Sequence, residues 1–482
     1  MFEIIAAAAT LAAAPLDASA VPQAMPAPTD IAGQSKAEPV KTGDTDLQNH
    51  PQNRDLPYDE DYSALRNSDR SSLWAKLKYI PIADSTYLTL GGEARTRLET
   101  RNGQRFGRGA QDPGDLEFRF RGWADLHVGE HLRGFFELKS GLQQDYSVPQ
   151  TVSDRKDVDI GQAFVELRNP IGGDGTIALR VGRQEIGIGA FRLFDMRDGL
   201  NVRRSLDAAR LMIAKGAWNG EVLGGYAQNE TLTAFDNSTN ENFSFYGARL
   251  ARKAQLGPMA STIEGLWIHS DRKGAVYAAG SAAERRNTYS LRVNGHGGKV
   301  DYDIEGTVQD GRWGDQQVSA NYVSANASYL LDGSWKPKLG VRFERASGDR
   351  NAADGKMSTY FSLFARPLTL NGELNRANMT IFGPSLTVTP TKKLTLDATV
   401  NDLLRTTTGD GIYLGSGVLL RGATEGTSRQ VGVRTTLGAR YLLSPFVTVG
   451  AYYNHVDAGR FLKQSGNGSD LNYATIFATF RL

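Results

Sequence analysis

The amino-acid sequence predicts an all-β fold, a transmembrane antiparallel up-and-down β-barrel of eighteen strands. Three observations predict it. Residue character alternates with period two in many segments of strand length. Short and long connections alternate between these segments. Beyond the first residues, no apolar run is long enough for a spanning helix. A mean hydropathy of −0.38 agrees with this class, because a barrel strand needs only half of its residues apolar.

The last stretch of the chain carries the alternation most clearly. From Tyr473 to Leu482 one face is entirely apolar, with Ala474, Ile476, Ala478, Phe480 and Leu482. A final strand that ends on an apolar residue is typical of bacterial outer-membrane barrels.

Two earlier segments place charges on one face and an apolar stripe on the other. Residues 88–101 and 116–127 do so with the charged-face residues Glu93, Arg95, Arg97, Glu99, Arg101, Glu117, Arg119, Arg121 and Asp125. A soluble sheet rarely repeats so many charges on one face in strand after strand. We therefore expect the charged face to line a wet lumen.

The same pattern predicts the full set of strands. Their expected spans are 88–101, 115–127, 131–141, 157–168, 175–184, 203–215, 219–229, 241–254, 258–271, 285–297, 299–312, 316–331, 336–347, 376–389, 393–405, 428–443, 446–458 and 470–482.

Connection lengths predict how the barrel sits in the membrane. Most odd-numbered connections are long, including 102–114, 142–156, 185–202, 272–284, 348–375 and 406–427, whereas the even-numbered ones are short turns. This places the short turns and both termini on the periplasmic side. Aromatic residues near strand ends are expected to form two interfacial girdles, with Tyr87, Phe106, Trp123, Tyr146, Trp218, Trp313, Trp335, Tyr441 and Phe446.

Three regions are expected along the chain. Residues 1–20 are interpreted as a signal peptide, because an apolar stretch precedes the cleavage site Ala18-Ser19-Ala20, although no basic residue comes first. Residues 21–84 form a periplasmic leader, disordered at first. Its later part, 56–82, is either a plug or short helix in the barrel mouth or an anchor for the first strand. Residues 85–482 form the barrel.

The choice of basic residue points to anions. The chain has 39 arginines and 16 lysines at a net charge of only +2, and arginine suits bidentate contact with carboxylate, sulfate or phosphate. The absence of cysteine agrees with a Gram-negative envelope protein.

The predicted alternation turns a set of charged residues into the lumen. Among them are the candidate binding residues Glu93, Arg95, Arg97, Arg119, Arg121, Arg133, Arg180, Arg342, Arg434 and Arg440. Guanidiniums gathered at one depth would lower the barrier for an anion and exclude cations. The alternative is a structural ladder in which arginines and acids mainly pair with one another and stiffen the wall.

The segment from Gly182 to Leu211 is the most distinctive in the chain. Its loop carries Arg192 and Arg197, and Arg204 leads into the following strand. Such a loop either folds inward and narrows the pore or stays extracellular, held by its own ion pairs with Asp195 and Asp198.

Here the sequence resembles the alginate-export family of outer-membrane porins. The matching positions are Gly182, Arg183, Gln184, Glu185, Gly189, Arg192, Leu193, Asn201, Arg204, Ser205, Asp207, Arg210 and Leu211, with further similarity in residues 91–97 and 119–121. The resemblance implies an eighteen-stranded barrel with an arginine-rich constriction that passes an anionic uronic-acid polymer, and it adds Asp207 to the candidate site. Leu206 and Ala208 depart from the usual Phe and Gly, and the connection after Leu443 is a tight turn where some members have a long gating loop.

Enzymatic functions find little support. The six histidines are scattered without an H-E-x-x-H motif, and no G-x-S-x-G elbow, metal-ligand cluster or phosphate-binding loop is present. We expect no cofactor and no nucleic-acid partner. The expected function is passage of an anionic polysaccharide or oligosaccharide across the outer membrane, with outer-membrane lipid and possible periplasmic secretion proteins as partners. The alternatives are an uptake porin for small anionic sugars and a plugged structural or adhesive barrel.

Overall fold

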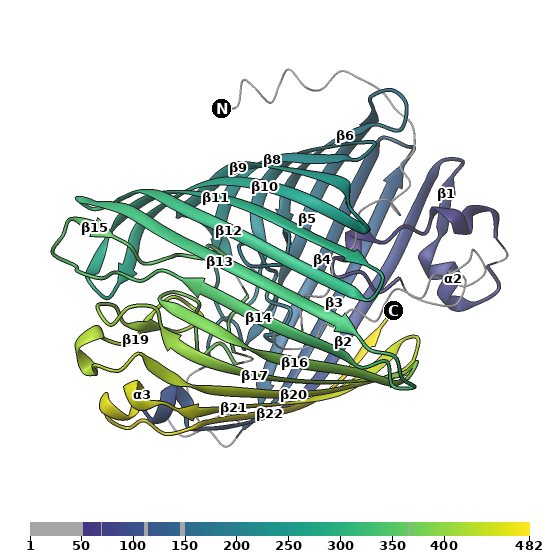
Figure 1. Ribbon diagram of the computed structural model, residues 1–482. Helices are drawn as coiled ribbons and strands as arrows, with labels where there is room; N and C mark the ends of the chain where they lie inside the picture. The colour runs from purple at the N-terminus through teal and green to yellow at the C-terminus, as the bar shows by residue number, and fades with distance from the viewer. Residues whose placement is uncertain (1–51, 69, 110–113, 145–149, 365, 370) are drawn as a thin grey trace.

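The computed structural model describes residues 52–68, 70–109, 114–144, 150–364, 366–369 and 371–482. The expected signal peptide and the first part of the expected leader, residues 21–51, lie outside these ranges. Within them, eighteen antiparallel strands form one closed barrel (Figure 1), which confirms the predicted fold class. The barrel closes where β22 pairs with β2, from Glu93 opposite Arg481 to Asn102 opposite Asn472.

The eighteen strands correspond one to one with those predicted. They are β2 (Thr86–Asn102), β3 (Asp115–Val128), β4 (Leu132–Gln144), β5 (Lys156–Pro170), β6 (Thr176–Gln184), β7 (Leu206–Lys215), β8 (Trp218–Asn229), β9 (Ser238–Leu256), β10 (Met259–Tyr277), β11 (Gly280–Gly297), β12 (Val300–Trp313), β13 (Gln316–Leu330), β14 (Lys338–Ala346), β16 (Met379–Thr391), β17 (Leu394–Arg405), β20 (Gln430–Ser444), β21 (Val447–Ala458) and β22 (Leu471–Arg481).

Smaller elements belong to the connections and to the N-terminal region. They are η4 (Pro57–Asp59), η5 (Ser63–Asn67), α2 (Leu73–Lys78), β1 (Ile80–Ala83), η6 (Gln104–Gly107), β15 (Lys356–Met357), β18 (Ile412–Tyr413), β19 (Leu419–Arg421), η7 (Ala423–Glu425) and α3 (Arg460–Gln464). No helix in the described ranges is both long enough and apolar enough to cross a membrane.

Alternation along each strand separates an apolar outer face from a charged inner one. On β2 and β3 the outward Leu98 and Phe120 are 52% and 48% exposed, whereas the inward Arg95 and Arg119 are buried. A closed sheet pairs every strand with two neighbours, which leaves no unpaired edge in the lipid. The apolar outer band is therefore the surface that faces the membrane.

One predicted loop is wrong. Residues 272–284 were expected to form a long connection, but β10 and β11 continue to a tight turn in which Tyr277 lies opposite Gly280. The hairpin extends because its inward residues remain packed: Ala275 and Tyr277 form a buried cluster with Trp313. The other predicted long connections lie at one end of the barrel, the long-loop end, and the short turns lie at the other, the short-turn end.

Outward aromatic residues form two belts around the barrel. One belt lies toward the long-loop end, with Tyr226, Tyr246, Trp267 and Tyr289, and the other toward the short-turn end, with Trp218, Tyr329, Trp335 and Tyr441. The prediction is wrong for Tyr87, Phe106, Trp123 and Trp313, which are buried. Tyr146 lies outside the described residues, and Phe446 packs on the ring of Trp74.

The N-terminal segment, defined as the described residues from 52 to 79, combines the two roles considered for it. Its α2 helix lies at the short-turn end, where Trp74 packs 5.1 Å from the ring of Phe446 and Lys78 Nζ donates to the carbonyl oxygen of Leu482 at 3.0 Å. The preceding residues Leu56 and Tyr58 enter the barrel and pack on wall side chains. The segment is both an anchor at the mouth and an insertion into the lumen.

A substitution at Gly91 tests how tightly the hairpin of β2 and β3 is packed. It lies directly opposite Trp123, whose indole covers it so closely that an added Cβ would overlap the ring. We expect Gly91→Ala to destabilise the barrel by about 1–3 kcal/mol, the usual cost of overpacking. Urea unfolding of the barrel in lipid vesicles, followed by heat-modifiable migration on gels, measures this change. Gly306→Ala on β12 is the matched control, because its Cβ would face open space; equal midpoints for both variants would contradict the prediction.

Candidate functional site: loops and arginines inside the barrel

The loop between β6 and β7, residues 185–205, folds into the barrel. On one side the guanidinium of Arg95 donates to the carbonyls of Asp198 and Leu200 at 3.0 and 2.8 Å, and Arg119 donates to Asp198 at 2.9 Å. On the far side Arg192 forms ion pairs with Asp303 at 2.8 Å and Glu305 at 2.7 Å on β12. Since β2–β3 and β12 lie on opposite sides of the barrel, this loop crosses the lumen. The alternative of a purely extracellular loop is wrong.

A second segment, residues 347–378 between β14 and β16, crosses beside the first. Phe364 and Phe194 form a parallel bridge between the two segments, in which Phe364 N donates to Leu193 O at 2.9 Å and Asp195 N donates to Phe364 O at 3.0 Å. Arg366 adds an ion pair with Asp195 at 3.0 Å. The two crossing segments therefore form one joined body.

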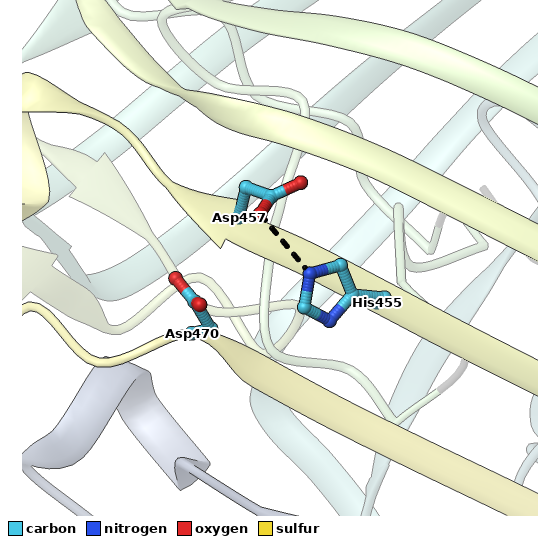
Figure 2. Close-up of side chains that lie close together, drawn as sticks. All are labelled: His455, Asp457 and Asp470. Atoms are coloured by element: carbon cyan, nitrogen blue, oxygen red, sulfur yellow. Dashed lines mark ion pairs between the residues drawn. The ribbon is translucent and has the colours of Figure 1, made fainter.

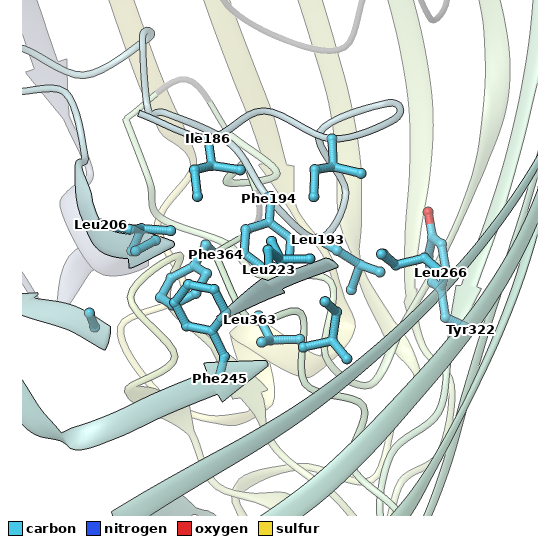
Figure 3. Packing of buried hydrophobic residues seen from close by; sticks show 14 of the residues in the cluster. Ile186, Leu193, Phe194, Leu206, Leu223, Phe245, Leu266, Tyr322, Leu363 and Phe364 are labelled. Atoms are coloured by element: carbon cyan, nitrogen blue, oxygen red, sulfur yellow. The ribbon is translucent and has the colours of Figure 1, made fainter. Parts of the chain in front are cut away.

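Apolar side chains attach this body to the wall. In Figure 3, Phe194, Leu193, Phe364 and Leu363 from the crossing segments pack among wall residues such as Phe245 and Leu266. The ring centroids of Phe194 and Phe245 lie 5.5 Å apart at a steep angle. Such packing fixes the position of the loops and of the arginines they carry.

The N-terminal segment reaches the same body from the short-turn end. Tyr58 donates from its hydroxyl to the carbonyl of Glu185 at 2.6 Å, and its own carbonyl accepts from Arg133 at 2.7 Å. The carbonyl of Asp55 accepts from Arg203 at 2.9 Å. Burial raises the pKa of Tyr58 to about 12, so the hydroxyl stays a donor at neutral pH.

Most of the predicted inward arginines are paired with acids. These pairs are Arg97 with Glu99 and Glu117, Arg119 with Glu93 and Asp198, Arg121 with Glu137 and Glu185, Arg133 with Asp125, Arg180 with Glu166, Arg192 with Asp303 and Glu305, Arg197 with Glu230, and Arg342 with Glu344. Paired guanidiniums and carboxylates in this number match the structural ladder that was the alternative to an anion path.

Four predicted arginines differ, because no described carboxylate forms an ion pair with them. Arg95 donates to the loop carbonyls, and Arg434 donates to Leu368 O and to Asn401 Oδ1. Arg440 is half-buried, with the charge of Asp397 in its neighbourhood. No ion pair among the described residues therefore offsets the positive charge of these arginines directly.

Arg204 is the fourth predicted arginine that forms no ion pair with a described carboxylate. Its guanidinium lies 5.5 Å from the Phe364 ring, and its Nη1 is buried without a hydrogen-bond partner. Burial, together with the nearby charge of Arg197, lowers the pKa of Arg204 to about 9. The side chain is therefore still charged at neutral pH and offers hydrogen-bond donors to an anion.

A second group of arginines lies inside the barrel near β14 and β20. Arg342 and Arg376 both donate to Glu344, at 2.7 and 3.0 Å. Arg434 is close enough to be repelled by both of these arginines. Three guanidiniums therefore gather near Glu344.

Asp207 lies outside the lumen. It stands between the inward Leu206 and Ala208, opposite the outward Tyr226, and pairs with Arg183 at 2.9 Å on the outer face. The resemblance placed it in the candidate site, and the local alternation contradicts that placement, since Asp207 is three residues from the inward Arg210.

Two acidic groups come close enough together to be considered for a metal ion. Glu99, Asp115 and Glu117 gather inside the barrel, but Arg97 and Arg101 already pair with these carboxylates. The other group, His455, Asp457 and Asp470, lies on the outside. Sequence reasoning also missed Arg366 and Arg376, because nothing in residues 348–375 distinguishes an inserted loop from an external one.

Comparison with known proteins identifies a family model and solved structures that resemble this barrel. The family model "Alginate export" matches residues 86–477, and no curated protein matches the chain. Three similar solved structures are porins of Pseudomonas aeruginosa. OccK11 (OpdR) is 11% identical, with a TM-score of 0.55, and the match covers 82% of this chain and 96% of that one. The outer membrane protein OpdK is 10% identical, with a TM-score of 0.56 and coverage of 82% of this chain and 98% of that one. OccK2 (OpdF) in complex with glucuronate is 10% identical, with a TM-score of 0.55 and coverage of 82% of this chain and 98% of that one. Because the family model covers most of the chain and the barrel agrees with it, this protein belongs to the alginate export family of outer-membrane porins.

Proposed function

We propose that this barrel conducts acidic saccharides across the outer membrane, and that their carboxylates pass along the arginines without acidic partners. The observation that carries the proposal is the guanidinium of Arg204 at the crossing loops: its Nη1 is buried without a hydrogen-bond partner, and no described carboxylate forms an ion pair with it. An ionised carboxylate would supply an ion-pair partner and an acceptor for Nη1.

The paired arginines support this role in a different way. Their bidentate contacts, such as Arg121 with Glu137 at 3.0 and 2.8 Å, fix the wall, and Arg121 also donates to Glu185 of the crossing loop at 3.3 Å. A frame held this way lets a few free guanidiniums meet the solute without reorganising. Selectivity in this proposal belongs to the unpaired subset rather than to every inward arginine.

A second candidate is uptake of small anionic sugars. The three segments that enter the lumen support it, since each reduces the space left for a polymer. The structurally similar OccK2 (OpdF) was solved with glucuronate, a single acidic sugar. The two candidates share the same chemistry at the arginines and differ in the length of the solute.

Replacing the free cations tests anion selectivity. Removing one charge near the path changes the energy of a passing ion by about 1 kcal/mol in water at 4 Å, or roughly fivefold in permeability. We therefore expect Arg204→Ser with Arg434→Ser to lower the ratio of anion to cation permeability at least about fivefold. Reversal potentials in planar bilayers under a salt gradient measure this ratio. Arg285→Ser on the outer face, where the side chain is 77% exposed, is the control. An unchanged ratio in the double variant would rule out these two residues as the selectivity determinants.

The geometry of Arg204 predicts a separate effect on binding. Lysine keeps the charge but loses the planar fork, so Arg204→Lys should weaken current block by oligogalacturonate while bare conductance stays close to wild type. Arg197→Lys should change block much less, because Arg197 is already paired with Glu230. Block by mono-, di- and longer uronates in the same recordings separates the small-sugar candidate from the polymer candidate. Equal block of wild type and Arg204→Lys would count against a binding role.

We also propose that the N-terminal segment limits flow from the short-turn end, which is the periplasmic end in outer-membrane barrels. Tyr58 supports this, since its ring lies 5.4 Å from Phe164 and 4.1 Å from the guanidinium of Arg180.

Truncating that side chain should loosen the insertion. We expect Tyr58→Ala to raise single-channel conductance or open probability, because it removes the ring contacts and the hydrogen bond to Glu185. The control is Leu73→Ala in the same segment, where the side chain is 73% exposed. Traces of Tyr58→Ala that match those of Leu73→Ala would show that the segment is an anchor only.

A further inference from the structure

A histidine and two aspartates meet on the outer face of the last hairpin, away from the lumen. His455 and Asp457 lie on β21, and Asp470 ends the connection that leads into β22 (Figure 2). Both β21 side chains point outward, because the alternating residues Asn454, Val456 and Ala458 are buried inside. One ligand atom from each of the three residues lies within 4.8 Å of the others.

The two carboxylates oppose each other across the hairpin. Val456 is opposite Leu471, so the next pair outward brings Asp457 against Asp470, and the amide of Ala458 donates to Asp470 Oδ1 at 2.8 Å. Like charges placed directly opposite destabilise a strand pair. No lysine or arginine in the described ranges forms an ion pair with either of these aspartates, so the pair invites a cation.

The imidazole is oriented as a metal ligand would be. His455 Nδ1 lies 2.8 Å from Asn472 Oδ1, and that same oxygen accepts from the Tyr453 hydroxyl at 2.8 Å. An Nδ1–H donated to Asn472 leaves the lone pair on Nε2, which faces Asp457 Oδ1 at 3.2 Å. Hydrogen bonds of this kind fix the tautomer of metal-binding histidines and aim the other nitrogen at the ion.

We propose that His455, Asp457 and Asp470 bind a divalent transition-metal ion of the zinc type. One imidazole nitrogen and two carboxylate oxygens suit such an ion better than Ca²⁺, which takes six to eight oxygens. Asp457 is 64% exposed, so water can complete the coordination and the ion can enter from solvent. Ligand atoms around a zinc ion lie closer together than 4.8 Å, so binding draws Asp470 toward β21.

The bound ion would cross-link two neighbouring parts of the chain. It joins β21 to residues 459–470, whose α3 helix buries Phe461 and Leu462 in an apolar cluster. Fixing this connection at its outer edge opposes fraying of the last hairpin. The site is independent of the proposed transport function, because none of its residues faces the lumen.

Zinc titration of the untagged, full-length barrel in detergent tests the proposal. After treatment with a chelator, we expect calorimetry with ZnCl₂ to give one site per chain. His455→Gln should weaken it at least tenfold, and Asn472→Ala, which only removes the orienting hydrogen bond, should weaken it roughly tenfold. Added zinc should also raise the melting temperature of wild type but not of His455→Gln.

His296→Gln is the matched control. His296 is more exposed and is likewise hydrogen-bonded to an aspartate, Asp301, but among the described residues no third ligand lies beside these two. The proposal requires that this variant bind zinc as wild type does. Absence of a site in wild type, or equal affinity in wild type and His455→Gln, would overturn it and leave His455 as a simple partner of Asp457.

Discussion

The interior of an eighteen-stranded wall is wider than its own side chains can fill, and the rest of this structure depends on how the chain occupies that space. Residues 55–58, 185–205 and 347–378 enter the barrel, and each brings backbone carbonyls that need donors once water is displaced. Wall arginines supply them. Arg95 and Arg119 donate to the carbonyls of Asp198 and Leu200, Arg133 donates to that of Tyr58, and Arg434 donates to that of Leu368. The arginine content thus has a structural cause before it has a functional one.

The arginines inside the barrel are therefore of two kinds, those in ion pairs and those without an acidic partner. A paired arginine such as Arg180, 2.5 Å from Glu166, is too costly to release, because breaking a buried pair leaves an uncompensated charge. Arg204 has no such partner, so meeting a passing carboxylate breaks nothing. A lumen in which every arginine were free would hold anions too tightly to conduct, whereas a few free cations in a neutralised frame give attraction without trapping.

The strands were predictable from sequence because one physical rule, period two with lipid on one side, acts at every residue of the barrel. Ion pairs were not, since the partner of an inward arginine depends on strand register and on where the loops go: Arg192 meets β12, more than a hundred residues away. The prediction of a long loop at residues 272–284 was wrong for the same reason, because the packing of Tyr277 on Trp313 is a tertiary contact. For Asp207 the signal was present, in its spacing from Arg210, and the family resemblance outweighed it.

The position of the N-terminal segment follows from the wall itself. The turns at the short-turn end are tight, as at Pro445 and Phe446 between β20 and β21, so none of them is long enough to reach into the lumen. The chain that precedes β2 enters from that side instead. Its attachment next to β2 keeps it at high effective concentration, so modest contacts suffice to hold it. Anchor and insertion therefore depend on different residues: Trp74 and Lys78 hold the segment at the mouth, whereas Tyr58 lies in the lumen.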